Sequence, residues 1–270
     1  MKQRSLLSRL HINGICYLVG ALILLLGVPL YQQLVLVPLG YSSTLAASSS
    51  GNFTPYLLWM RSYSVQFVVY RALLTIAFLL LLTLPFTLFR IIVAQEILGQ
   101  QERAEETATD EQVDAEQLET DGMPAYAWRG KGFAVVAAWS GLFGLVAYLL
   151  GTLASTLYFV VVSHGVLLPN TLAMPASVLS LMTNTVGIGL LALATLFLGA
   201  TIARSGRKLW PDSWVAFGYL ALAVAALLSG SAVAVSTAPT QATLTSPAIL
   251  LFALWVLWMG IMLVRLKPEV

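Results

Sequence analysis

Histidine placement limits the metal and hydrolytic chemistry open to this chain. It has two histidines, His11 before the first apolar run and His164 after the third. If these runs cross a membrane, the two imidazoles lie on opposite faces and cannot bind one metal or haem within a monomer. Ser163 and His164 are adjacent and project from different sides of a helix, so they do not form a hydrolytic dyad. The apolar runs contain no paired acids, and the chain has no H-E-x-x-H or nucleotide-loop motif. We expect no catalytic site, metal or cofactor.

Three uncharged polar residues interrupt the fourth apolar run. They are Thr183, Asn184 and Thr185. In hydrocarbon an amide seeks a hydrogen-bond partner, so Asn184 is expected to face another helix. Two interpretations stay open for this polar intramembrane cluster, namely a structural link between helices and a substrate-binding amide.

Small residues recur at four-residue spacing in the third and fifth apolar runs, a pattern that lets helix backbones approach closely. We predict that these two runs form the packed centre of the bundle. We expect the Leu-rich second run to face lipid more, and the sixth run to be peripheral. The helix-packing residues of the third run are Ser140, Gly144, Ala147, Gly151 and Ser155. The fifth run has two such ladders, one of Ala221, Ala225 and Ser229 and the other of Ala226, Gly230 and Ala234.

The amino-acid composition predicts that lipid surrounds much of the chain's surface. Of 270 residues, 59% are hydrophobic and 10% are charged, whereas soluble domains have about 25% charged residues. So few charges cannot cover a water-facing surface, and isolated strands would leave backbone groups unsatisfied in lipid. We therefore predict one all-α membrane domain, residues 1–270, built as a helical bundle of six transmembrane helices. The expected spans are 15–37, 72–93, 133–162, 178–202, 214–236 and 248–264.

Two arginines bracket the second apolar run. Arg71 and Arg90 have 18 uncharged residues between them, and their long side chains can reach opposite headgroup layers. We interpret them as membrane-depth anchors. Pro29 and Pro85 fall within the first and second spans and are expected to kink them.

The distribution of positive charge predicts the orientation, because cytoplasmic loops are enriched in Lys and Arg. With the N-terminus inside, the cytoplasmic segments hold twelve of the fourteen basic residues, and only Arg61 and Arg71 lie outside. Both termini are therefore expected in the cytoplasm. The Ala-, Leu- and Gly-rich spans with short outer loops are typical of a multi-pass protein of a prokaryotic inner membrane.

The loop 38–71 is the larger segment expected outside the cytoplasm. It opens with a Ser-, Gly- and Ala-rich stretch that we expect to be flexible, up to Ser50-Gly51. Thr54-Pro55 then predicts a helix start, with a capping side chain followed by proline at the first helical position. The helix from Pro55 either projects outward or lies along the interface and bends into the second span. Its mixture of Tyr, Trp, Arg and aliphatic residues favours the interfacial version.

The segment 95–123 concentrates negative charge on the cytoplasmic side. It holds ten of the twelve acidic residues, with Arg103 as its one base. Residues 96–106 are rich in helix formers and are expected to prolong the second span, whereas the rest has too little apolar surface to fold alone. We weigh three roles for this acidic linker: a solvated connector, a docking site for a basic cytoplasmic partner, and a site for divalent cations.

The absence of a recognisable reaction site favours a non-enzymatic protein. We expect a subunit or accessory protein of a membrane complex, with the lipid bilayer and other membrane subunits as partners and no nucleic acid. The alternative is a transporter or binding protein for a neutral or lipophilic small molecule, favoured by the Asn184 cluster and the proline-bearing spans. An enzyme acting on lipid would need a site that the sequence does not show.

Overall fold

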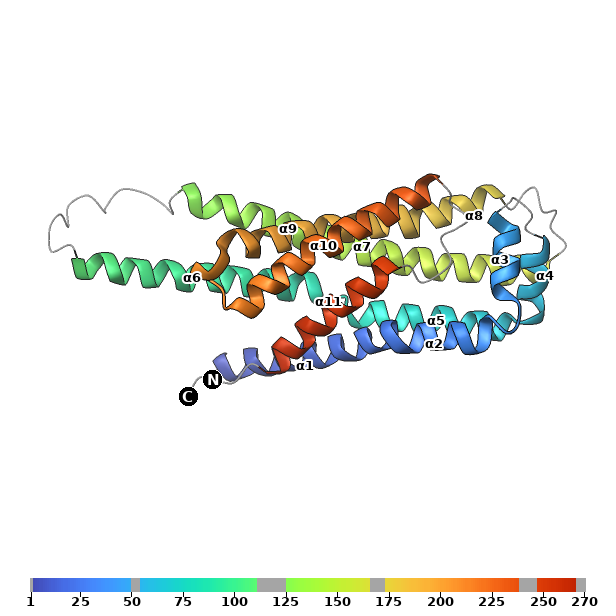
Figure 1. Ribbon diagram of the computed structural model, residues 1–270, viewed down its shortest axis with the longest axis horizontal. Coiled ribbons are helices and arrows are strands. Elements are labelled where there is room, and N and C mark those ends of the chain that lie inside the picture. Colours follow the sequence, from blue (N-terminus) through green and yellow to red (C-terminus); the bar gives the residue numbers. More distant parts are fainter. Residues whose placement is uncertain (1, 50–53, 111–124, 166–172, 238–246, 266–270) are drawn as a thin grey trace.

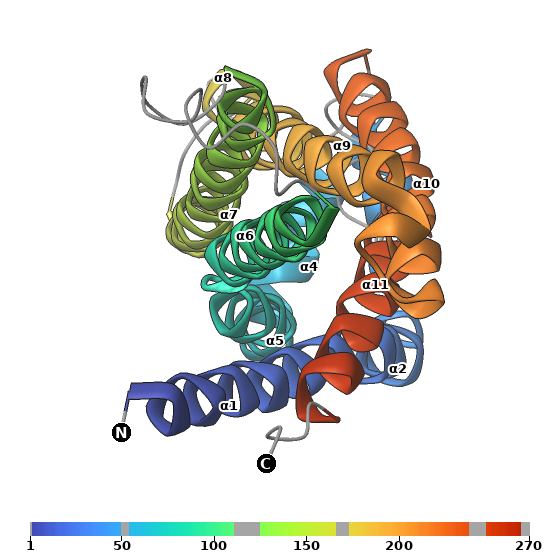
Figure 2. The same ribbon diagram turned by 90° about the vertical axis from the view of Figure 1, so that its left-hand side faces the viewer.

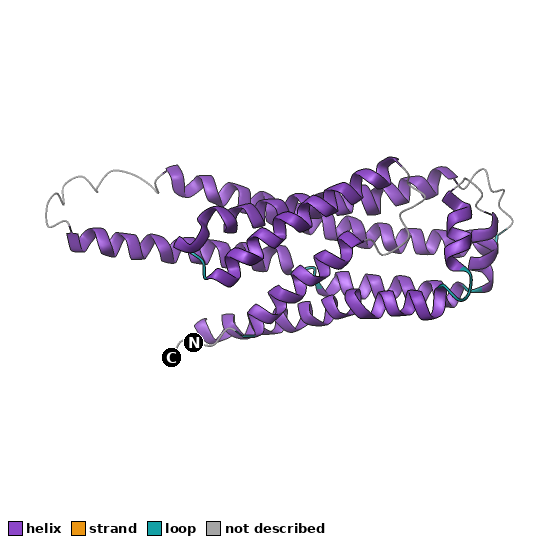
Figure 3. Ribbon diagram, viewed as in Figure 1, coloured by secondary structure: helices purple, strands orange, loops and turns teal. Residues whose placement is uncertain are grey.

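Helices make up every regular element in the part of the chain that the computed structural model describes, residues 2–49, 54–110, 125–165, 173–237 and 247–265 (Figures 1 and 3). Six helical segments are long and apolar enough to cross a membrane. The prediction of an all-helical chain with six apolar segments is therefore confirmed. We call the segments spans one to six. They are Arg9–Leu36, Ser64–Ile97, Gly132–His164, Pro175–Ser205, Asp212–Ala234 and Pro247–Val264.

Span one is a single rod with two wide turns. It comprises α1 (Lys2–Leu22) and α2 (Val28–Tyr31), with π-helical turns at Ile23–Gly27 and Gln32–Leu36. In the first of these turns the Val28 amide donates to the carbonyl five residues back. Proline has no N–H and crowds the carbonyl four residues before it. The wider turn next to Pro29 relieves this crowding, so the rod continues through the proline (Figure 1).

Two short helices lie across one end of the bundle, roughly perpendicular to the spans in Figure 1. These are α3 (Tyr41–Ser49) and α4 (Thr54–Ser62), and we call this the α3–α4 end. The predicted flexible stretch was wrong, because α3 is a helix. The buried residues Tyr41, Leu45 and Ser48 recur at helical spacing, and Gly40, with a φ of 85°, supplies the sharp turn before them.

The start of α4 at Thr54 matches the predicted helix start, and a bend at Tyr63 separates α4 from α5 (Ser64–Leu80).

The second span consists of two helices, α5 and α6 (Leu84–Asp110), with a break between them. A turn separates the two helices. Pro85 occupies the second position of α6, where a missing N–H costs no helical hydrogen bond. The predicted kink at Pro85 is thus a complete break, and α6 continues well beyond the apolar segment.

The remaining spans run back and forth between the two ends. Span three is α7 (Ala125–His164), and span four joins α8 (Ala173–Ser180) to α9 (Ile188–Ser205) through a π-helical turn at Leu181–Gly187. A 3-10 turn at Gly206–Lys208 leads to α10 (Asp212–Thr237), and α11 (Pro247–Val264) forms span six. The start of α1 and the end of α11 lie at the same end of the bundle, opposite α3 and α4 (Figure 1).

The spans close into a ring. Each span packs against its neighbours in sequence, and α11 packs against α1 to close the circle. Figure 2, viewed along the long axis, shows α5 and α6 between α1 on one side and α7 and α9 on the other. In such a ring every span has one face toward the centre.

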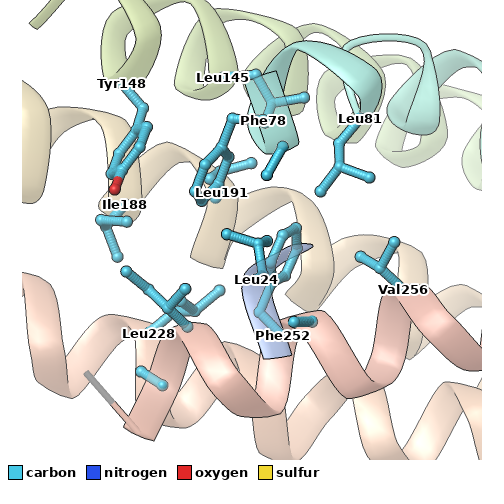
Figure 4. Close-up of a cluster of buried hydrophobic side chains, with 14 of the residues drawn as sticks. Leu24, Phe78, Leu81, Leu145, Tyr148, Ile188, Leu191, Leu228, Phe252 and Val256 are labelled. Atoms are coloured by element: carbon cyan, nitrogen blue, oxygen red, sulfur yellow. The ribbon is translucent and has the colours of Figure 1, made fainter. Parts of the chain in front are cut away.

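All six spans contribute to the core within this ring (Figure 4). The ring of Phe78 in α5 packs at a tilt against Tyr148 of α7, with centroids 4.2 Å apart, and is parallel to the ring of Phe252 in α11 at 6.3 Å. Trp255 is 1% exposed, and its indole donates to the Phe217 carbonyl of α10 at 3.3 Å. The expectations of a peripheral sixth span and a lipid-facing second span were therefore wrong. Because the spans form a closed ring, large side chains of spans two and six point to its centre. The spacing of small residues in the sequence does not predict this placement.

Candidate functional site

The predicted polar cluster of span four does not act as a unit. Its residues lie in the π-helical turn, and each makes a different bond. Thr183 packs against Gly151 of α7 and donates to the Leu179 carbonyl of its own helix at 2.8 Å. Asn184 donates to the Ser180 carbonyl one turn before it at 3.2 Å, and Thr185 donates to the Ala232 carbonyl of α10 at 3.4 Å. One of these three hydrogen bonds, that of Thr185, links span four to a neighbouring helix. The amide of Asn184 was expected to bond another helix, but its nitrogen donates to the backbone of its own helix.

The small residues of span three lie at a close helix crossing. A side chain at Gly144 would meet the Gly187 carbonyl and the Leu191 amide of span four at 2.9 Å. At Gly151 it would overlap the Thr183 hydroxyl. Ser140 and Ser155 are also buried, and Ala147 is half-buried.

One of the two predicted ladders of span five, the one with Gly230, faces away from the bundle. Ala226, Gly230 and Ala234 are exposed, and an added side chain at Gly230 would meet nothing within 4 Å. Ala221 and Ala225 of the other ladder are buried instead. The expectation that the Gly230 ladder packs at the centre was wrong for the single chain. The two stripes have the same spacing, and the contact with α9 selects one of them.

The two bracketing arginines differ in their surroundings. Arg90 is exposed. Arg71 is only partly exposed, and its guanidinium reaches α7, where Nη2 donates to Ser155 Oγ at 2.5 Å and Nε to Thr156 Oγ1 at 3.2 Å. Sequence reasoning placed Arg71 at the edge of a span that begins at residue 72. Because α5 begins at Ser64, Arg71 instead lies about 10 Å along that helix.

The groups that contact the Arg71 guanidinium are neutral hydroxyls and an aromatic ring. The Ser155 and Thr156 hydroxyls both donate their own protons to the Thr152 carbonyl, at 3.0 and 2.7 Å, so they present lone pairs to the guanidinium. The ring of Phe67 lies 5.7 Å from the guanidinium carbon, a cation–π distance. Among the described residues no carboxylate lies within 4 Å of Arg71, and the Oγ1 atom of Thr152 is buried without a hydrogen-bond partner.

An aromatic cluster covers this arginine at the α3–α4 end. Tyr41 of α3 packs against Trp59 of α4 and Tyr70 of α5, with ring centroids 4.9 and 6.3 Å away. The Trp59 indole donates to the Leu39 carbonyl at 2.7 Å and holds α4 against the preceding turn. Burial raises the pKa of Tyr56 to about 12, although the nearby Arg71 charge acts to lower it. The Tyr56 hydroxyl therefore stays neutral at physiological pH.

A second polar network holds the break in span two. The Tyr17 hydroxyl of α1 lies 2.8 Å from both the Thr83 and Thr87 hydroxyls, and Asn13 Nδ2 donates to Thr87 at 3.1 Å. Sequence reasoning missed this group. A usable signal was present, since Asn13 and Tyr17 are four residues apart, as are Thr83 and Thr87, so each pair occupies one helix face.

A narrow apolar crevice of about 10 Å³, room for about one water molecule, adjoins this break between α6, α7, α9 and α11. Leu84 and Pro85 of α6 face Gly141 and Leu145 of α7 there, and Trp255 of α11 closes one side. The hydroxyl of Thr195, the polar side chain in this lining, donates to carbonyls of its own helix. The crevice therefore offers apolar surface and no free charge.

The two histidines lie far apart, in the first helix and at the end of the third span. His164 is exposed, with Nδ1 2.9 Å from the Val160 carbonyl and 3.2 Å from the Ser163 hydroxyl. The expectation that the Ser163 and His164 side chains point apart was therefore wrong. The Ser163 hydroxyl donates its proton to the Val160 carbonyl at 2.8 Å. Within the described ranges, no three His, Cys, Asp or Glu residues come together as metal ligands.

Comparison with protein-family models, curated proteins and solved structures found no match for this chain.

Proposed function

We propose that this chain is a non-enzymatic integral membrane protein that works as a subunit or accessory protein of a membrane complex. Support comes from the six apolar segments and from the long α6 helix. The proposal places the protein in the inner membrane of a prokaryotic cell, with both termini in the cytoplasm and the α3–α4 end outside.

The proposed orientation follows the charge asymmetry of the chain. Its test uses single cysteines in a Cys16→Ser background and a membrane-impermeant maleimide. Ser43 of α3 and Ser213 of α10 are both exposed and lie at opposite ends of the bundle. We expect labelling of Ser43→Cys from outside intact cells and of Ser213→Cys only after lysis. The reverse pattern would overturn the orientation.

The observation that carries the proposed role is the continuation of α6 past the apolar segment. Figure 1 shows α6 projecting beyond the turn between α9 and α10. This part of the helix includes the acidic residues Glu102, Glu105, Glu106 and Asp110, and Arg103 is its one basic residue. The helix is attached to the bundle near its base, where Gln95 Nε2 donates to the Leu209 carbonyl at 2.7 Å. A projecting acidic helix is suited to docking a basic cytoplasmic partner.

The test of this role is a charge-neutralised chain and a charge-matched control. The first variant carries Glu102→Gln, Glu105→Gln and Glu106→Gln, and the control carries Asp at the same positions. Native gel electrophoresis of mild-detergent extracts should show a complex larger than the 29.1 kDa chain for the wild type and the Asp control. We expect the Gln variant to lose that complex. A monomeric wild-type protein, or a complex that all three chains retain, would contradict the proposal.

A second candidate is binding of a neutral lipophilic small molecule, favoured by the break in span two. The crevice beside the break measures about 10 Å³, so such a molecule would bind there only if the surrounding helices moved apart. Broken helices often mark binding sites in membrane transporters. Ala194 of α9 lines the crevice, and Ala200 of the same helix is exposed. A neutral brominated alkane should quench Trp255 fluorescence in a saturable way. We expect Ala194→Leu to abolish the saturable part and Ala200→Leu to keep it. Equal quenching of both variants would refute this candidate.

A further inference from the structure

Arg71 lies at the rim of the seam between α5 and α7. On α5 its neighbours Phe67 and Tyr70 are buried, at 2% and 1% exposure, whereas Val68 is 40% exposed. On α7 its partner Ser155 is buried, whereas Thr156 is partly exposed. The guanidinium is therefore attached to the core on one side and accessible from the outer surface of the bundle on the other.

Within the described ranges of the chain, the hydrogen-bonding capacity of this guanidinium is only partly used. Arginine has five N–H donors, and two of the Arg71 nitrogens, Nε and Nη2, donate to hydroxyls of α7. Those hydroxyls carry no charge, and no described carboxylate lies within 4 Å of the guanidinium. A cation in an apolar segment needs a counter-charge or strong dipoles. The unused donors and the unbalanced charge both favour an anionic ligand with several oxygens.

The surroundings of the accessible side are aliphatic. Val68, three residues before Arg71 on α5, is 40% exposed, and Leu153, three residues before Thr156 on α7, is 47% exposed. A soluble anion would lose its hydration beside these side chains. A phospholipid, in contrast, carries a phosphate next to acyl chains that match such a surface.

We propose that Arg71, with the α5–α7 seam around it, binds the phosphate of a net-anionic phospholipid. A guanidinium can donate two parallel hydrogen bonds to one phosphate. A zwitterionic headgroup would also bring an ammonium group, and no described carboxylate lies near the guanidinium to pair with it. The rings of Tyr41, Tyr56 and Tyr70 are packed together and at most 3% exposed, so they cannot bind the ammonium by cation–π contact. This inference rests on the proposed membrane location and is independent of the accessory role.

The test compares lipid retention in three variants of the full chain. Arg71→Gln removes charge and donors, Arg71→Lys keeps the charge without the planar fork, and Arg61→Gln is the matched control, since Arg61 is exposed at the same end of the bundle. The proteins are reconstituted in vesicles of phosphatidylcholine with a minority of phosphatidylglycerol and analysed by native mass spectrometry after delipidation. We expect retained phosphatidylglycerol to fall about tenfold, which corresponds to about 1.4 kcal/mol, in Arg71→Gln, with an intermediate loss in Arg71→Lys and none in Arg61→Gln.

A second measurement on the wild type keeps the test valid if Arg71→Gln fails to fold. Spin-labelled phosphatidylglycerol should show a larger immobilised fraction than spin-labelled phosphatidylcholine, and free inorganic phosphate should leave that fraction unchanged. Equal fractions for the two lipids, equal retention by Arg71→Gln and Arg61→Gln, or competition by inorganic phosphate would each overturn the proposal. Membrane extraction of the same samples reports separately on whether the chain is integral, so loss of membrane location is distinguishable from loss of lipid binding.

Discussion

Replacing Gly144 with alanine tests the close crossing of spans three and four. The added methyl group would lie 2.9 Å from both the Gly187 carbonyl oxygen and the Leu191 amide nitrogen. These are backbone atoms, so no side-chain rotation can relieve the overlap. Spans three and four must therefore separate locally, and the neighbouring contact of Thr183 with Gly151 is disturbed with them.

The expected magnitude comes from a comparison with Gly230→Ala. Overpacking a closely packed site costs about 1–3 kcal/mol, whereas an alanine in a helix interior is favoured over glycine by about 1 kcal/mol. Gly230 also lies within a helix, and an added methyl group there meets nothing within 4 Å. Because both variants gain the same helix propensity, their difference isolates the packing term. We expect Gly144→Ala to be less stable than Gly230→Ala by about 1–3 kcal/mol.

Reversible unfolding in mixed micelles of mild detergent and dodecyl sulfate, followed by tryptophan fluorescence, measures this difference. A Gly144→Leu variant should be worse still, because it adds volume at the same crossing. Equal unfolding free energies for Gly144→Ala and Gly230→Ala would refute the reasoning, since the two glycines would then have equivalent surroundings.

Three further predictions concern the polar and aromatic groups. Tyr17→Phe removes the hydroxyl that bonds Thr87, so we expect a loss of about 1 kcal/mol in unfolding free energy and faster amide hydrogen exchange at the break in span two. Trp59→Phe leaves the Leu39 carbonyl without its indole donor; proteolysis at the α3–α4 end should become faster, while the six spans stay protected. The pKa of Tyr56 is raised from 10 to about 12 by burial, so the folded state binds this proton more tightly than the unfolded state. Stability should therefore fall as pH rises from about 10 to about 12, and Tyr56→Phe should flatten that fall; an unchanged slope would contradict the assignment.

Local features that depend on neighbouring residues were predictable. Thr54 followed by Pro55 indicated a helix start, and α4 begins there. Pro85 indicated a kink, and span two is broken just before it. The helix-forming residues after 95 indicated an extension of span two, and α6 continues to Asp110. The part of the acidic linker at 111–123 lies outside the described residues, so its expected disorder stays a prediction.

Features that depend on which surfaces meet were not predictable from spacing alone. The flexible stretch before Ser50 is partly a helix, because Tyr41 and Leu45 find a buried surface against α4 and α5. Its Ser- and Ala-rich composition gives weak local signals, and the aromatic partners come from later in the chain. Arg71 and Arg90 look alike in the sequence, yet only Arg71 has hydroxyl partners on an adjacent helix.

The sequence by itself determined the helical class and the six apolar segments, because each property follows from the energy of placing one stretch of chain in water or hydrocarbon. The tertiary structure alone decided how those segments close into a ring, with span six against span one. It also decided that Gly144 is at a crossing and Gly230 at the surface, and that Arg71 points into the α5–α7 seam. Helices of similar apolarity can be arranged in many orders, and the choice among them depends on the fit of side chains from distant parts of the chain.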